Sequence, residues 1–181
     1  LEYDEDDTII IFIRNPYERL VSGFLHQYAN SFTVYARAQW RNDKELTFKN
    51  FVEELTTNRF KRINRHHFTS QLSENWEDSI GEREKTYFYD INKIPYDFLG
   101  ILFDRKIPDE LINFRGDHGN KNPVLDRLNF KVYDKKSDTF EKFRPKTSLF
   151  YNKEILRDVT IFYEKDLFYF NKQGFSYVLP E

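Results

Sequence analysis

Two arginines and a serine, Arg14, Arg19 and Ser22, lie five and three residues apart in the segment FIRNPYERLVSGF, which spans residues 12–24. Arg14 follows an apolar run and precedes Asn15 and Pro16, which are typical of the first turn of a helix. The N-terminus of a helix attracts anions through its backbone N–H groups and its dipole. Because a guanidinium can bind two phosphate oxygens at once, Arg14 at this position predicts a phosphate site.

Two further side chains could extend this site along the helix. Ser22 follows Arg14 by about two helical turns and could donate its hydroxyl to the same phosphate. Arg19 comes three residues before Ser22, on nearly the same face, and could join the anion site or pair with a carboxylate that holds the helix in place. The competing interpretation is that Arg14 only ends a strand and pairs with Glu18, four residues later.

The elements around this segment predict an α/β fold. The run from Thr8 to Ile13 is typical of a strand buried on both faces, and apolar residues from Tyr17 to Tyr28 recur at helical spacing. Further expected elements are a helix at 47–55 capped by Thr47, a strand at 85–91, a helix starting near Pro95, a loop at 115–123 and a helix at about 152–170 with Gly174 just beyond it. Alternating strands and helices favour a parallel sheet, and in such sheets ligands bind beyond the carboxyl ends of the strands, where Arg14 lies.

The composition argues against several classes of protein, among them nucleic-acid-binding, membrane-spanning and disulfide-bonded proteins. The 181 residues are expected to form one domain, and their net charge of −2 argues against bulk binding of nucleic acid. No apolar run approaches the roughly 20 residues that span a bilayer, and the start LEYDEDD is unlike a signal peptide. The chain has no Cys, which excludes disulfides and thiolate metal sites, and its four His form no zinc pattern. We therefore expect no metal.

The segment at 12–24 resembles the 3′-phosphate-binding motif of sulfotransferases, R-[DN]-P-x-x-R-x-x-S in the membrane-associated carbohydrate branch. Arg14, Pro16, Arg19 and Ser22 match this motif, and Asn15 stands where Asp is commoner. In that family the first Arg and the Ser bind the 3′-phosphate of the sulfate donor PAPS. The resemblance implies these donor-binding roles for Arg14 and Ser22.

Other segments match the same family in the same order along the chain. HFTSQL resembles an H-x-x-x-Q element and places His67 and Gln71 on the match. DHGNKN is similar to an H-x-N-x-[ST] loop, although Asn122 stands where Ser or Thr is usual. LTFKNFVEEL is similar to S-F-x-x-F, YFYDINKIPYDFLGILF to a strand, an acidic residue and a helix, and FYEKDLFYFNKQGFSY to a closing Y-x-x-D-hydrophobic-x-x-F helix. The resemblance implies the P-loop-NTPase-like sulfotransferase fold, a central parallel sheet flanked by helices.

The resemblance also implies an activity. The expected reaction moves a sulfuryl group from PAPS to a hydroxyl of an acceptor, in this branch a carbohydrate, without a metal. His67 and Gln71 could contact acceptor hydroxyls. The resemblance implies that the catalytic base is a Glu or His near the donor loop, upstream of residue 1, so the base stays unassigned; His67 is the candidate within this chain, because an unperturbed His titrates near neutrality. Lys121, with His118 and Asn120, belongs to a loop that approaches the nucleotide in related folds. The alternative is a non-catalytic nucleotide- or glycan-binding module of the same fold.

One part of the family pattern has no match in the chain. The family's 5′-phosphosulfate loop, a basic residue and Gly followed by Ser or Thr, precedes the R-[DN]-P motif, and nothing before Arg14 resembles it. Either residues 1–181 are the C-terminal two-thirds of a full domain, which the absence of an initiator Met favours, or the loop was lost. The composition favours a bacterial-type cytoplasmic protein, with the Golgi lumen as the alternative if a membrane anchor was removed.

Overall fold

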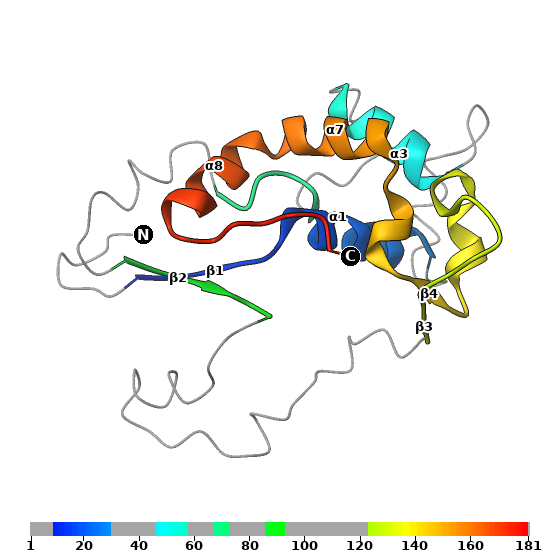
Figure 1. Cartoon of the computed structure of the whole chain (residues 1–181), viewed down its shortest axis with the longest axis horizontal. Coiled ribbons are helices and arrows are strands. Elements are labelled where there is room, and N and C mark those ends of the chain that lie inside the picture. Colours follow the sequence, from blue (N-terminus) through cyan, green and yellow to red (C-terminus); the bar gives the residue numbers. More distant parts are fainter. Residues whose placement is uncertain (1–8, 30–45, 58–66, 73–85, 93–122, 181) are drawn as a thin grey trace, which may run out of the picture. The chain divides into compact units, whose positions relative to one another are not determined.

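The computed structural model describes residues 9–29, 46–57, 67–72, 86–92 and 123–180. These residues form helices and short parallel strands, which confirms the predicted α/β class (Figure 1). The chain forms two compact units, the first from residues 1–14 and 74–121 and the second from residues 15–73 and 122–181. A single domain over residues 1–181 stays a prediction, and the helix expected near Pro95 lies outside the described residues.

The first unit contains the predicted parallel strands. β1 (Ile9–Ile13) pairs in parallel with β2 (Thr86–Asp90), and Ile13 lies opposite Asp90. The backbone N–H of Ile91 donates to the Ile13 carbonyl at 2.8 Å and extends the ladder beyond β2. Parallel pairing brings the carboxyl ends of both strands to one edge of the sheet, and Arg14 follows β1 directly at that edge.

The prediction that β1 is buried on both faces is wrong. Phe12 is 47 % exposed, and Tyr87 on β2 is 45 % exposed. Side chains alternate along a strand, and the register pairs Ile10 with Tyr87, so Phe12 and Tyr87 lie on the same face of the sheet. The β-branched residues of β1 favour a strand, but they do not determine whether a face of the sheet is buried. Burial depends on which other elements cover that face.

In the second unit, α1 (Pro16–Phe24) begins where the sequence predicts. The Asn15 side chain accepts a hydrogen bond from the Tyr17 backbone N–H at 3.0 Å, and Pro16 occupies the first helical position. The helical pattern reaches Tyr28 as expected, but α1 ends at Phe24 and continues as the π-helix η1 (Leu25–Ala29). Periodicity predicted the buried face correctly, but it did not predict the wider turn.

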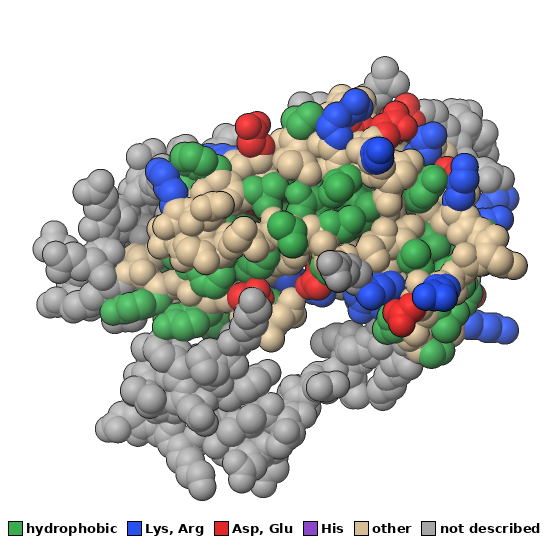
Figure 2. Space-filling model, viewed as in Figure 1, with side chains coloured by type: hydrophobic (Ala, Val, Ile, Leu, Met, Phe, Trp, Pro, Cys, Tyr) green, Lys and Arg blue, Asp and Glu red, His purple; other side chains and the backbone are tan. Residues whose placement is uncertain are grey.

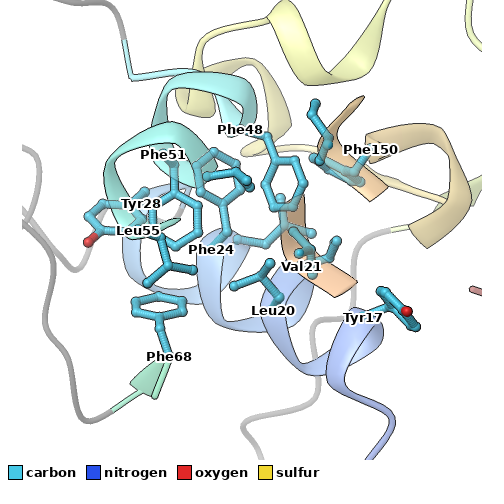
Figure 3. Packing of buried hydrophobic residues seen from close by; sticks show 14 of the residues in the cluster. Tyr17, Leu20, Val21, Phe24, Tyr28, Phe48, Phe51, Leu55, Phe68 and Phe150 are labelled. Atoms are coloured by element: carbon cyan, nitrogen blue, oxygen red, sulfur yellow. The ribbon is translucent and has the colours of Figure 1, made fainter. Parts of the chain in front are cut away.

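Aromatic rings form the core of this unit (Figure 3). The Phe24 ring, fully buried on α1, lies 5.2 Å from the ring of Phe48 and 5.3 Å from that of Phe51, measured between centroids. Both partners belong to α3 (Phe48–Thr56), which is capped by Thr47 as predicted, with the Thr47 hydroxyl accepting from the Asn50 backbone N–H at 3.1 Å. Aromatic residues therefore make up a large part of the core of this unit.

Short elements connect this core to the last helices. They are β3 (Val124–Leu125), the 3-10 helices η4 (Val132–Asp134) and η5 (Ser137–Phe140), β4 (Arg144–Pro145) and the 3-10 helix η6 (Thr147–Phe150). β3 and β4 pair in parallel. Phe140 and Phe150 insert their rings into the aromatic core, 5.4 Å apart between centroids.

The helix predicted at about 152–170 is divided into two. α7 (Lys153–Phe162) and α8 (Glu164–Lys172) are separated by Tyr163, whose ψ of 18° departs from helical geometry. Tyr163 is 1 % exposed and Asp166 is fully buried, so the break occurs where two polar side chains enter the interior. Beyond α8, Gly174 adopts the left-handed conformation with φ of 84°, as is common for a residue that ends a helix. None of the described helices is long and apolar enough to cross a membrane.

Gly23 allows a close approach between α1 and residues 67–72. A Cβ built on Gly23 would lie 2.7 Å from the nearest ring carbon of Phe68. The Phe68 ring is fully buried, and its centroid lies 4.8 Å from that of Phe51. Only a residue without a side chain fits between this ring and the helix.

We expect Gly23→Ala to destabilise the protein by about 1–2 kcal/mol, because overpacking against the Phe68 ring exceeds the gain of about 1 kcal/mol in helix propensity. Urea denaturation would measure the change in the free energy of unfolding. In the background of Phe68→Leu the same substitution should cost less, since the ring is gone. A more stable Gly23→Ala protein would contradict the close contact.

Candidate functional site

The predicted phosphate site begins at the junction of β1 and α1. Arg14 is half-buried and lies between the last residue of β1 and the N-cap residue Asn15. α1 is nine residues long, so its dipole places a partial positive charge near Arg14. The backbone of this junction thus has the strand–Arg–helix order that the sequence predicts.

The helix N-terminus offers fewer backbone donors than its position suggests. Pro16 has no N–H, and the N–H of Tyr17 is bound by the Asn15 side chain. The Asn15 amide in turn donates to the carbonyl of Val178 at 2.9 Å and ties the C-terminal segment to the start of α1. An anion at this helix would therefore depend mainly on side chains, which raises the importance of Arg14 and Ser22.

Ser22 and Arg19 are both half-buried on α1, three residues apart and on nearly the same face. The Arg19 guanidinium donates from Nη1 to the carbonyl of Thr69 at 2.7 Å. Burial raises the pKa of the Asp166 carboxyl, and the charge of Arg19 opposes part of this rise. Of the two roles predicted for Arg19, this geometry supports an electrostatic interaction with a carboxylate that holds elements together; the donor-binding role stays a prediction.

Residues 67–72, which contain the predicted His67 and Gln71, are held by hydrogen bonds from distant parts of the chain. The Tyr163 hydroxyl donates to the Phe68 carbonyl at 2.6 Å. The Asp166 carboxylate accepts from the Ser70 hydroxyl and, at 2.9 Å, from the Gln71 backbone N–H. We call residues 67–72 the HxxxQ segment.

This arrangement brings part of the predicted site together. Phe68 packs against Gly23, the neighbour of Ser22, while Arg19 binds the same segment, so the HxxxQ segment lies against α1. His67 is exposed and its ring meets that of Phe68 edge-on, with centroids 6.3 Å apart. Gln71 is half-buried. The predicted nucleotide-loop residues His118, Asn120 and Lys121 lie outside the described residues.

Burial changes the ionisation of two groups beside this segment. Burial raises the pKa of Tyr163, so its hydroxyl stays protonated and remains a hydrogen-bond donor at neutral pH. Burial also raises the pKa of Asp166, while the hydrogen bonds from Ser70 and Gln71 and the charge of Arg19 lower it in part. Buried polar groups of this kind are stable only with partners, which the HxxxQ segment and α1 supply.

We also searched the described part of the chain for a metal site and for charged surfaces. No three His, Cys, Asp or Glu side chains among the described residues come close enough together to hold a metal ion. Lys and Arg side chains gather around β3 and β4 (Figure 2), where Arg127, Lys131 and Lys142 are exposed. Asp126 and Glu141, which neighbour Arg127 and Lys142 in the sequence, are exposed as well, so this surface carries both signs of charge.

Comparison with known proteins decides the family. The family described as "Sulfotransferase family" matches residues 3–173, which is nearly the whole sequence. The chain belongs to the sulfotransferase family. No curated protein and no solved structure matches it. Membership makes this chain a transferase of sulfuryl groups and agrees with the resemblance inferred from the motifs.

Two important residues of this sulfotransferase have roles that its sequence did not predict. Tyr163 and Asp166 are the Y and D of the Y-x-x-D match, yet nothing in their spacing indicated what they bind. Two features could have drawn attention to Asp166. It is an acidic residue on a face that otherwise packs inward, and buried carboxylates require partners. The partners themselves are about 95 residues away and could not be read from the pattern.

We expect Asn15→Asp to loosen the C-terminal segment of this sulfotransferase while keeping α1 capped. A carboxylate still accepts from the Tyr17 N–H, but it cannot donate to the Val178 carbonyl. Hydrogen exchange measured by mass spectrometry should be faster in the peptide that contains residues 175–180. The matched control is Asn152→Asp, the same change at the N-cap of α7. Equal protection of that peptide in both variants would contradict the tether.

We expect Asp166 to make stability depend on pH in a defined direction. Its pKa in the folded protein is raised above the ordinary 3.8, so its contribution to stability is greatest below pH 3.8 and is lost as the pH rises through the folded pKa. Asp166→Asn removes the titrating carboxyl and with it this pH-dependent contribution to stability. The difference in free energy of unfolding, wild type minus Asp166→Asn, should therefore fall between about pH 4 and the folded pKa. Urea denaturation at several pH values measures it, and a difference that rises with pH would contradict the raised pKa.

Proposed function

We propose that this sulfotransferase uses PAPS as donor and a carbohydrate hydroxyl as acceptor. The observation that carries the proposal is the order β1–Arg14–Asn15–α1, with Ser22 on the same helix, in a chain that belongs to the sulfotransferase family. A cationic fork beside a helix N-terminus, with a hydroxyl further along the same helix, suits a phosphate monoester such as the 3′-phosphate of PAPS. This donor set fits the nucleotide, so Arg14 and Ser22 are the residues that would hold it.

The proposed reaction forms one bond and breaks one. The acceptor oxygen attacks the sulfur of the donor, the bond from sulfur to the 5′-phosphate oxygen breaks, and adenosine 3′,5′-bisphosphate leaves. The proton of the acceptor hydroxyl passes to a base. Like phosphoryl transfer, this step requires in-line geometry and cations that stabilise the leaving group, with little covalent chemistry from the protein.

On the acceptor side, the proposal uses the HxxxQ segment. His67 is exposed, so its imidazole is accessible to an incoming hydroxyl, and it remains the candidate base within the chain. Gln71 could orient the acceptor through its amide, which both donates and accepts hydrogen bonds. The segment lies against the same helix that carries Ser22, which supports a shared site for the two substrates.

Titration of the purified chain with adenosine 3′,5′-bisphosphate by calorimetry tests the donor. We expect binding that 5′-AMP does not reproduce. Arg14→Ala should weaken this binding about tenfold to a hundredfold, because a hydrogen bond to a charged group contributes roughly 1.5–3 kcal/mol. The matched control is Arg157→Ala, which removes an exposed arginine of α7 that is paired with Asp158. Equal affinity for both nucleotides would contradict recognition of the 3′-phosphate.

Transfer of radiolabelled sulfate from PAPS to a panel of desulfated polysaccharides tests the acceptor. Labelled polysaccharide would support the enzyme with a carbohydrate acceptor. Nucleotide binding without transfer to any member of the panel would instead favour the non-catalytic module of the same fold. Loss of binding in Arg14→Ala together with loss of transfer would connect the two functions to one site.

A further inference from the structure

Residues from two distant parts of the chain converge on the HxxxQ segment. Arg19 of α1 donates to the Thr69 carbonyl, and the Tyr163 hydroxyl at the α7–α8 break donates to the Phe68 carbonyl. Asp166, one turn later on α8, accepts from the Ser70 hydroxyl and the Gln71 N–H. Four consecutive residues of the segment, 68–71, are thus each bound by a side chain from elsewhere.

We infer that Arg19, Tyr163 and Asp166 are positioning residues, which hold the HxxxQ segment so that His67 and Gln71 keep a fixed place against α1. The acceptor role of these two residues rests on the proposed function, whereas the positioning rests on the hydrogen bonds alone. This assigns a common task to three motif segments that are far apart in the sequence.

Burial of the segment does not explain these bonds. The Phe68 ring is fully buried in the aromatic core and would already keep the segment attached. Apolar contacts are non-directional, however, so a ring alone leaves the backbone on either side free to rotate. Hydrogen bonds are directional, and three of the four, to the carbonyls of Phe68 and Thr69 and to the N–H of Gln71, act on the backbone itself and fix its orientation between His67 and Gln71.

The segment has no ladder of its own that could fix it otherwise. It is a short turn in which Ser70 Oγ lies 2.6 Å from the Leu72 carbonyl and 3.2 Å from the Leu72 N–H, whereas the carbonyls of Phe68 and Thr69 and the N–H of Gln71 are bound by side chains from outside. Asp166 is suited to this task because a carboxylate can accept several hydrogen bonds at once, and because a fully buried one is costly to leave unpaired. The helix break matters as well, since Tyr163 at the break and Asp166 in the first turn of α8 both reach the same segment.

The decisive comparison is Tyr163→Phe against Tyr151→Phe in the full chain. Both hydroxyls are in the same core and donate to a backbone carbonyl, Tyr163 to Phe68 at 2.6 Å and Tyr151 to Tyr17 at 3.0 Å. We expect Tyr163→Phe to accelerate hydrogen exchange of the Gln71 amide about tenfold or more and to shift the NMR titration curve of His67. Tyr151→Phe should lower stability to a similar degree and leave both readouts unchanged.

A second pair of variants guards against a protein that fails to fold. Ser70→Ala removes one hydrogen bond to Asp166 and should change both the exchange rate of the Gln71 amide and the titration curve of His67. Ser70→Thr keeps the hydroxyl and should give the wild-type values of both. If Tyr163→Phe and Tyr151→Phe give the same exchange rate at Gln71 and the same His67 curve, the bonds only stabilise the fold and the inference is overturned.

Failure of this inference differs from failure of the proposed function. The exchange and titration readouts need no nucleotide and no acceptor, so they test positioning even in a chain that transfers no sulfate. Conversely, affinity for adenosine 3′,5′-bisphosphate should be the same in Tyr151→Phe and Tyr163→Phe, because the two hydroxyls donate to the carbonyls of Tyr17 and Phe68 and not to the residues proposed to hold the nucleotide. A nucleotide affinity that falls with Tyr163→Phe alone would show a disturbed α1 and would also overturn the inference.

Discussion

The cost of burying Asp166 constrains much of the second unit. A carboxylate taken out of water is stable only while hydrogen bonds and opposite charge replace the lost solvation. Here those partners are the Ser70 hydroxyl, the Gln71 N–H and the nearby charge of Arg19. The cost therefore ties α1, α8 and the HxxxQ segment into one arrangement, because movement of any of them would leave a buried charge without its partners.

The aromatic core supplies the other half of this arrangement. Rings from α1, α3 and η6 meet around Phe24, and Phe68 carries the HxxxQ segment into the same cluster past the bare backbone of Gly23. Edge-to-face contacts between such rings contribute beyond the buried area, but they tolerate sliding. Apolar packing thus brings the segment to α1, and the polar contacts determine how it is oriented there.

Local features of the sequence predicted local structure well. Asn15 with Pro16, and Thr47, are caps whose side chains act within three residues, so their roles follow from residue type alone. The break at Tyr163, the exposure of Phe12 and the partners of Asp166 were not predictable in this way. Each depends on tertiary contacts, such as the bond from Tyr163 to Phe68, that periodicity does not encode. The same holds for the candidate site. Arg14 and Ser22 were predicted from one short motif, whereas the contacts of Tyr163 and Asp166 became visible only in the folded structure.

Asn15 shows how a family motif adapts to its surroundings. Asp is commoner at this position in the motif, and either residue can accept the N–H that begins α1. Only the amide can also donate, and in this chain it donates to Val178. The junction that follows Arg14 is therefore fixed on two sides, by the helix it begins and by the C-terminal segment. For sulfuryl transfer such rigidity has a direct consequence, because small errors in the placement of a donor phosphate reduce in-line attack. Under the proposed function, Ser22 of α1 would help to bind the donor while the HxxxQ segment against the same helix would bind the acceptor, so α1 would hold the two substrates in a fixed relative position.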